Sequence, residues 1–157
     1  MLEHINSSPQ PTQTEFKENE IGLLSEFDME YFKTLEGIEG WIAIGQENCK
    51  NQRYFTVLNP TGDKLGVVGV YDTDDEQNIT HTVVDTKYRG KGLSRKFKDH
   101  LMDKLNLPFI TLTIKLDNKP SIRAAEKLPN IKRVSDTEYE ENYKKAKYIY
   151  IQENKKV

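Results

Sequence analysis

The segment from Thr82 to Lys98 constrains the fold of this chain more than any other part of the sequence. A short run of β-branched and apolar residues ends at Val84, and the glycines Gly90 and Gly92 then turn the chain. Beyond the turn, apolar residues recur every four positions, at Leu93, Phe97, Leu101 and Leu105. This switch from a strand period to a helix period predicts a strand, a tight turn and a helix in succession.

The beginning of that predicted helix suits an anion. The first N–H groups of a helix have no partner within it, and the helix dipole adds partial positive charge there. Although the chain has a net charge of −2, six basic residues lie within twelve positions: Lys87, Arg89, Lys91, Arg95, Lys96 and Lys98. The segment therefore predicts either a site for a phosphate-rich ligand or a solvated basic helix. Neither familiar phosphate loop fits, because Arg95 replaces the third glycine of G-x-G-x-x-G and no G-x-x-x-x-G-K-[ST] occurs.

The remaining hydrophobic patterns predict an α+β domain with a mixed central β-sheet flanked by helices. We expect helices over residues 28–36, from 93 and from 118, and strands over 53–58, 65–71, 78–85, 109–116, 131–134 and 147–152. Turn residues separate the first three strands, which predicts an antiparallel meander. The stripe of Met29, Phe32 and Leu35 is expected to face the core. Residues 41–44 fit a strand or the end of a helical pair, and 135–145 fit a loop or a short charged helix.

Length and composition indicate one globular domain. The chain has 157 residues. We expect a loose N-terminal arm over residues 1–20, with room for a short edge strand, and a single domain over 21–157. Cys49 is the one cysteine, so no intrachain disulfide can form. With no signal-peptide pattern and no run of about 20 apolar residues, the sequence predicts a cytoplasmic protein without a membrane segment.

Two motifs resemble those of the GNAT family of N-acetyltransferases. Residues 84–93, VDTKYRGKGL, resemble the acetyl-CoA signature of that family, in which a strand is followed by Arg/Gln-x-x-Gly-x-Gly/Ala and a helix. Ser94 stands at the last position of this pattern, where the family has Gly or Ala. Residues 118–128, NKPSIRAAEKL, resemble the later family helix N-x-x-S-x-x-x-x-E-K-x. The motifs occur in the order of the family, and the resemblance covers residues 53–134 best.

The resemblance implies that the protein binds acetyl-CoA as its co-substrate, without a metal. The pantetheine arm is expected between two splayed strands, against the backbone of Thr82, Val83 and Val84. The pyrophosphate is expected on the amides of the glycine turn. The cofactor-binding residues implied there are Arg89, Gly90, Lys91, Gly92, Leu93, Ser94 and Arg95, and Asn118 joins them after the second splayed strand.

The resemblance also implies how an acetyl group would reach an amine. A neutral primary amine attacks the thioester directly, which needs a base or water, a donor for the oxyanion and an acid for the thiolate. The Val84 N–H is the expected oxyanion donor. Ser121 is the expected acid, with Tyr143 as a weaker alternative. His81 is either the base or a packed strand histidine.

Departures from the family pattern leave other functions open. Ala125 stands where many members place a thiolate-protonating Tyr, and Thr113 stands where some members use a Glu as the base. A catalytically inactive acyl-CoA-binding module is therefore the first alternative. A binder of polyanions or nucleic acid is the second, and the net acidity disfavours it. The acidic run 72–76 lacks the pattern of a calcium loop and is expected to be a solvated hairpin tip. The acceptor amine is not specified, and a homodimer, common in the family, stays open.

Overall fold

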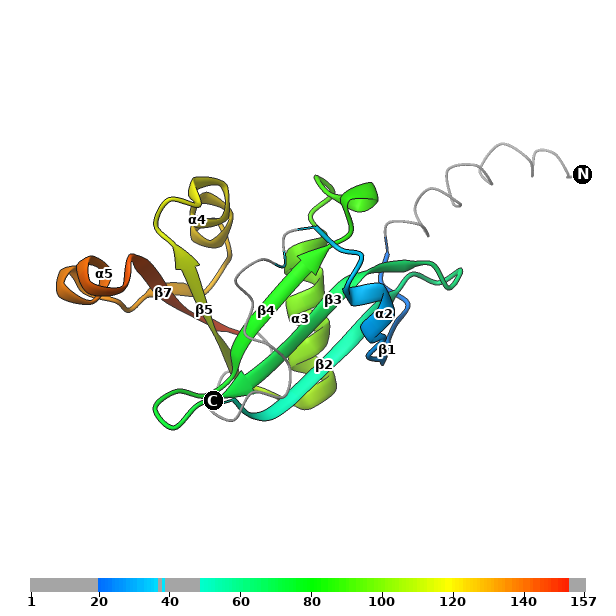
Figure 1. Ribbon diagram of the computed structural model, residues 1–157, viewed down its shortest axis with the longest axis horizontal. Helices are drawn as coiled ribbons and strands as arrows, with labels where there is room; N and C mark the ends of the chain where they lie inside the picture. The colour runs from blue at the N-terminus through cyan, green and yellow to red at the C-terminus, as the bar shows by residue number, and fades with distance from the viewer. Residues whose placement is uncertain (1–19, 37, 39–48, 153–157) are drawn as a thin grey trace, which may run out of the picture.

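The computed structural model of the protein describes residues 20–36, 38 and 49–152. Its strands form one mixed sheet in the order β1-β2-β3-β4-β5-β7-β6 (Figure 1). The elements are β1 (Leu23–Glu26), α2 (Met29–Phe32), β2 (Lys50–Leu58), β3 (Lys64–Asp72), β4 (Ile79–Val84), the 3-10 turn η1 (Thr86–Tyr88), α3 (Leu93–Leu105), β5 (Phe109–Lys115), α4 (Lys119–Glu126), β6 (Ile131–Arg133), α5 (Thr137–Tyr143) and β7 (Lys145–Ile151). The predicted α+β class with a mixed, helix-flanked sheet is confirmed.

Strands β1 to β4 form the predicted antiparallel meander. The turn between β2 and β3 is held by Asn59, whose side-chain oxygen accepts from the N–H groups of Thr61 and Asp63 at 3.1 and 2.9 Å. Gly62 takes a φ of +93° in this turn, a conformation that side chains with a Cβ rarely adopt. The asparagine and the glycine explain why the sequence marks this turn clearly.

Strands β4 and β5 are parallel neighbours that separate almost at once. The register pairs Ile79 of β4 with Thr111 of β5 and no later residue of either strand. Strand β5 instead pairs along its whole length with β7, from Phe109 opposite Ile151 to Lys115 opposite Lys145. The result is a V between β4 and β5 that opens toward the glycine turn and α4 (Figure 1).

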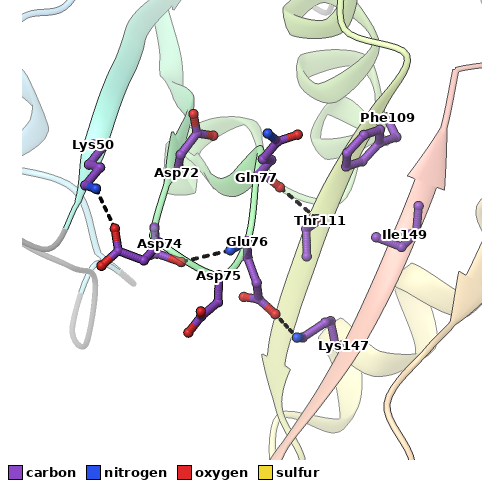
Figure 2. A pocket seen from close by; sticks show the side chains of 11 residues that line it. Lys50, Asp72, Asp74, Asp75, Glu76, Gln77, Phe109, Thr111, Lys147 and Ile149 are labelled. Carbon is purple, nitrogen blue, oxygen red and sulfur yellow. Dashed lines mark hydrogen bonds and ion pairs between the residues drawn. The ribbon is translucent and has the colours of Figure 1, made fainter.

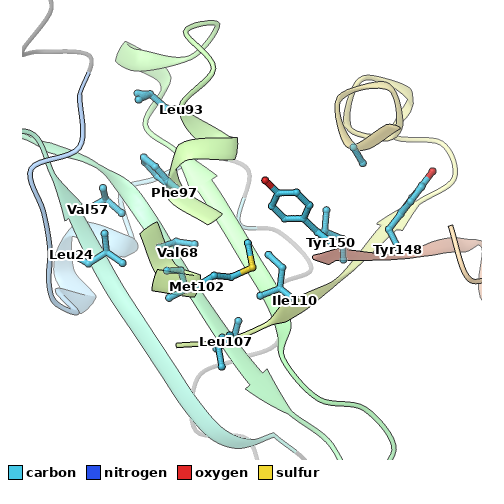
Figure 3. Close-up of a cluster of buried hydrophobic side chains, with 14 of the residues drawn as sticks. Leu24, Val57, Val68, Leu93, Phe97, Met102, Leu107, Ile110, Tyr148 and Tyr150 are labelled. Carbon is cyan, nitrogen blue, oxygen red and sulfur yellow. The ribbon is translucent and has the colours of Figure 1, made fainter. Parts of the chain in front are cut away.

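Helix α3 packs on one face of the sheet and supplies much of the core (Figure 3). Phe97, Leu101 and Met102 are fully buried there. The helix can lie close to β3 because position 66 is a glycine. A Cβ on Gly66 would stand 2.2 Å from the Val83 carbonyl oxygen and 2.8 Å from the Phe97 ring. Helix α3 can therefore pack beside the end of β4 only because residue 66 has no side chain.

A second, aromatic cluster covers the opposite face of β3 and β4. It contains Leu35, Cys49, Tyr54, Val67, Tyr71, Ile79 and Val83. The ring of Tyr54 lies against Gly69, where a Cβ would meet ring carbons at 2.4 and 2.5 Å. The free thiol of Cys49 is buried in this cluster, and burial raises its pKa. The packing gives Cys49 a structural place.

The first part of the domain differs most from the sequence prediction. The helix expected over residues 28–36 is one turn, α2, whose N-cap Asp28 accepts from the Tyr31 N–H at 3.1 Å. Of the predicted stripe, Leu35 is buried, Phe32 is half-buried and Met29 is exposed. The edge strand β1, Leu23–Glu26, lies beyond the predicted arm. Residues 135–145 contain the short helix α5.

Other predictions fall outside the described residues. These are the structure of the arm over 1–19, the cap at Gly37 and the element at 41–44. Within the part of the chain that the structure describes, no helix is long and apolar enough to cross a membrane.

Candidate active site

The glycine turn presents its backbone to open space. Gly90 and Gly92 have φ values of +82° and +74°, and a Cβ placed on either would meet nothing within 4 Å. Gly92 is the N-cap of α3, and no side chain caps the first turn of that helix. Since the first N–H groups of a helix lack partners within it, these amides are free to bind a ligand that enters the turn.

The turn is anchored to the sheet by Asp85. Its N–H donates to the Leu65 carbonyl at 2.8 Å, and its carboxylate accepts from the Lys87 N–H at 3.1 Å and from the Tyr31 hydroxyl at 2.9 Å. Burial and this hydrogen bond raise the pKa of Tyr31, which keeps its hydroxyl a donor. The segment around α2 is thereby tied to the turn.

Arg89 points back onto the protein rather than outward. Its Nε donates to the Val84 carbonyl at 2.8 Å, and its Nη2 donates to the Glu36 carbonyl at 2.7 Å. The guanidinium therefore braces the end of β4 against the segment that follows α2. Sequence reasoning counted Arg89 among the cations for the ligand and missed this bracing role.

A cleft of about 400 Å³ lies at the open end of the V, between the end of β4, the glycine turn and the first turn of α4, so it reaches both motifs. Its lining residues are Thr82, Val83, Val84, Tyr88, Arg89, Gly90, Gly92, Leu93, Ser94, Asn118 and Ser121. The cleft thus gathers most of the predicted cofactor residues with Ser121. Lys91 and Arg95 are exposed and lie outside the lining, and Tyr88 is an addition that the sequence did not suggest.

Strand geometry decides which backbone groups of β4 face the cleft. The N–H of Asp85 points to β3, since it bonds to Leu65. Along a strand, backbone groups alternate between its two edges. Those of Thr82 and Val84 therefore point toward β5, where the ladder has ended, and those of Val83 point toward β3. The backbone groups of Thr82 and the N–H of Val84 are therefore available to a ligand, whereas the Val84 carbonyl already accepts from Arg89.

The opposite wall of the cleft is the first turn of α4. Asn118 is its N-cap, and the side-chain oxygen accepts from the Ser121 N–H at 3.3 Å. Pro120 lies within the first turn, where its missing N–H costs nothing. This cap fixes Ser121 in the lining, with its side chain half-buried.

His81 lies outside the cleft lining. Alternation along β4 places it on the face of Ile79 and Val83, away from α3. Its Nδ1 is 2.7 Å from the Tyr54 hydroxyl, and its ring stacks against Tyr71 at 5.3 Å between centroids. Burial, aided by the charge of Lys145, lowers the pKa of His81 to about 4. The imidazole is therefore neutral at pH 7.

Lys98 is buried, although the sequence placed it in an exposed basic patch. Only 8% of its surface is accessible, and its Nζ donates to the hydroxyl of Ser94 at 2.7 Å. Desolvation lowers the pKa of Lys98 to about 8, against a smaller opposing effect of Asp99. The Lys98 ammonium thus lies one helical turn after Ser94, which lines the cleft.

The acidic hairpin tip after β3 lines a separate cavity of about 560 Å³ (Figure 2). Two of its carboxylates are paired with cations of the chain: Asp74 with Lys50, and Glu76 with Lys147. Asp72 accepts from the Asn78 N–H at 2.8 Å. In the described residues, no group of three or more His, Cys, Asp and Glu side chains could hold a metal ion.

Comparison with known families identifies the domain. Residues 11–128 match the family described as acetyltransferase (GNAT) domain. The chain belongs to the GNAT family. A search of curated proteins found no match.

Solved structures with the same fold agree with the GNAT assignment. One is a chimera of spermidine N-acetyltransferase SpeG from Vibrio cholerae with hSSAT, with a TM-score of 0.50 and 17% identity, covering 66% of this chain and 70% of that one. Another is a mutant form of the spermidine/spermine N-acetyltransferase SpeG from Vibrio cholerae, with a TM-score of 0.50, 15% identity and 66% of both chains covered. At these identities the likeness establishes the fold.

The structure shows where the residues lie that replace the usual catalytic side chains of GNAT proteins. Ala125 is buried in the core under α4. Thr113 lies on β5 opposite Lys147 of β7. Tyr143, the alternative acid, is 62% exposed, is absent from the cleft lining, and packs against Tyr139 at 4.7 Å between ring centroids. Of the two acids that the sequence offered, Ser121 lines the cleft and Tyr143 does not.

Proposed function

We propose that the protein transfers an acetyl group from acetyl-CoA to a primary amine. The proposal rests on one cleft at the open end of the V. It brings together unpaired backbone groups of β4, the start of α3 that no side chain caps, and Asn118, the N-cap of α4. An elongated ligand with an amide-rich arm and a pyrophosphate matches these three parts in order. We also propose that the chain from residue 21 onward is one catalytic domain.

The proposal assigns each part of the ligand to residues of this chain. The pantetheine arm extends β4 by bonding to the outward backbone groups of Thr82, which leaves the Val84 N–H for the thioester carbonyl. The pyrophosphate lies on the turn amides from Gly90 to Arg95, where glycine permits close approach. Asn118 contacts the ligand from the opposite wall.

The chemistry is a direct acyl transfer. The amine nitrogen attacks the thioester carbonyl carbon, so a C–N bond forms and the C–S bond breaks. The Val84 N–H stabilises the oxyanion, and Ser121 donates a proton to the departing thiolate. Water takes the proton that the attacking amine loses, and solvent returns a proton to Ser121, so the products are the amide and the free thiol. His81, which packs with Tyr54 on the other side of β4, is assigned a structural role.

Calorimetric titration with acetyl-CoA tests the proposal, on the native chain and on two matched variants. Gly92→Glu puts a carboxylate on the pyrophosphate site. Gly62→Glu adds the same charge and the same backbone strain at the open turn between β2 and β3. We expect Gly92→Glu alone to abolish binding. Native protein that fails to bind at millimolar acetyl-CoA would refute the proposal.

The buried Ala125 and the Thr113 substitution favour one second candidate, an acyl-CoA-binding domain without turnover. Release of free thiol in the presence of amines distinguishes the two. Spermidine and spermine are the first acceptors to assay, because two similar structures are named for acting on them. Binding without thiol release across a broad panel of amines would support the second candidate.

A further inference from the structure

The position of Lys98 is unusual for a cation in a domain of this size. It lies on α3 between Phe97 and the core residues Leu101 and Met102, with 8% of its surface accessible. Burial of an ammonium is unfavourable unless the charge is compensated. Its pKa stays near 8, so the side chain is still charged at pH 7.

No carboxylate of the described residues neutralises Lys98. The nearest acidic influence is Asp99, whose carboxylate is engaged by the Tyr150 hydroxyl at 2.6 Å and by Arg95 at 3.6 Å. The Nζ of Lys98 bonds instead to the Ser94 hydroxyl at 2.7 Å and approaches the Ser94 carbonyl at 3.5 Å. The apo protein therefore holds a buried positive charge without an ionic partner.

That charge connects directly to the cleft. Ser94 is in the first turn of α3, is exposed, and lines the cleft beside Gly92. A hydroxyl that accepts a hydrogen bond from an ammonium keeps its own O–H for donation. The proton of Ser94 is thereby directed away from Lys98, and a neighbouring positive charge strengthens the bond it donates.

We propose that Lys98 is a positioning residue that acts through the Ser94 hydroxyl and supplies the buried countercharge for the phosphates bound at the glycine turn. The turn amides orient the phosphates through hydrogen bonds, and the Lys98 ammonium neutralises part of their negative charge. The exposed Lys91 and Arg95 only raise the local concentration of the anion. The inference rests on the proposed function for the identity of the ligand, but its physical basis is an anion at this turn.

The decisive comparison uses two acetyl donors. Acetyl-CoA carries the pyrophosphate, and acetyl-pantetheine ends before it. In Lys98→Met, which keeps the length of the side chain, we expect the KM for acetyl-CoA to rise about tenfold or more, as for a lost charge-assisted contact. The kcat/KM for acetyl-pantetheine should change less than about twofold. Equal losses with both donors, or no loss with acetyl-CoA, would overturn the inference.

Two further measurements separate this role from a packing role. Removing an uncompensated buried charge should raise the melting temperature of the ligand-free protein, so Lys98→Met is expected to melt higher than native while it binds acetyl-CoA more weakly. Ser94→Ala should weaken acetyl-CoA as well, and the double variant should lose little more than either single one. Lys132→Met, an exposed change on β6, is the matched control and should alter neither property.

Titration with inorganic pyrophosphate keeps this inference independent of acetyl transfer. If native protein binds pyrophosphate and Lys98→Met does not, the countercharge role holds even when no amine is acetylated. If both bind pyrophosphate equally, the role fails even when the enzyme proves active.

Discussion

The Nε of Arg89 donates a hydrogen bond to the carbonyl oxygen of Val84 at 2.8 Å. Only residues 85–88 separate the two, so the bond closes the loop that leaves β4. The same guanidinium bonds to the Glu36 carbonyl at 2.7 Å, which ties the closed loop to the segment after α2. The orientation of Val84, and with it the N–H that the proposed reaction uses, therefore depends on Arg89.

Replacing Arg89 should impair catalysis more than folding. Arg89→Gln removes the hydrogen bonds to both carbonyls. Arg89→Lys keeps the charge but lacks the planar guanidinium that donates to two carbonyls at once. We expect kcat/KM for acetyl-CoA to fall roughly tenfold in both, since a misplaced oxyanion donor costs transition-state stabilisation. Steady-state kinetics of thiol release measure this. Arg123→Gln, exposed on α4, is the control, and equal effects of the two glutamine variants would contradict the prediction.

Gly66→Ala should be strongly destabilising. The new Cβ would stand 2.2 Å from the Val83 carbonyl oxygen, and backbone must shift to accommodate it. A loss of about 2 kcal/mol or more of unfolding free energy is expected, as for overpacked core sites. Gly62→Ala shares the positive φ but has open space around it, so it should cost about 1 kcal/mol. Urea unfolding compares them, and similar midpoints for the two variants would show that the contact with Phe97 and Val83 is not decisive.

His81 should make stability depend on pH in the acidic range. Its folded pKa is about 4, below the ordinary value of 6.5, so the unfolded chain takes up a proton first as pH falls. Stability contributed by neutral His81 is complete above about pH 6.5 and declines toward pH 4, by roughly 2 to 3 kcal/mol. Unfolding of native protein and His81→Gln across this range measures it. His100→Gln, exposed on α3, should keep the native slope; an unchanged slope in His81→Gln would rule out the assignment.

Ser121 should affect turnover rather than binding. Ser121→Ala leaves the Asn118 cap intact, because that bond uses the backbone N–H. Loss of a proton donor to the thiolate should lower kcat about 10- to 100-fold, with the dissociation constant of acetyl-CoA nearly unchanged. Tyr143→Phe tests the alternative acid and should be silent. If Tyr143→Phe lowers kcat and Ser121→Ala does not, the roles must be exchanged.

The parts of the fold that were predictable are those set by local chemistry. The meander, the glycine turn and α3 each combine a clear period with turn residues, and the structure has all three. Strand β1 was missed because its sequence, LLSE, has one buried residue, Leu24, and three that face outward or stay half-exposed. A four-residue edge strand depends on pairing with β2 rather than on its own pattern.

The parts of the site that were missed depend on tertiary contacts. No feature of the sequence around Arg89 indicates that its side chain turns toward Glu36, which is distant in the sequence. Lys98 was within reach of the sequence, however. At about 100° per residue, position 98 lies between Leu105 and Met102 around the helix axis. The four-residue steps assigned only Leu93, Phe97, Leu101 and Leu105 to the buried face of the helix. Without Met102, that face ended at Leu105, and Lys98 was placed outside it.

The cleft at the open end of the V is bordered by main-chain groups of Thr82 and Val84 and by the amides of the glycine turn. Every amino acid except proline supplies the same N–H group. Mutation can therefore exchange most side chains around such a surface without deleting its donors, provided that the glycines and the splay of the strands persist. The main-chain donors around such a cleft can therefore survive long divergence of the sequence.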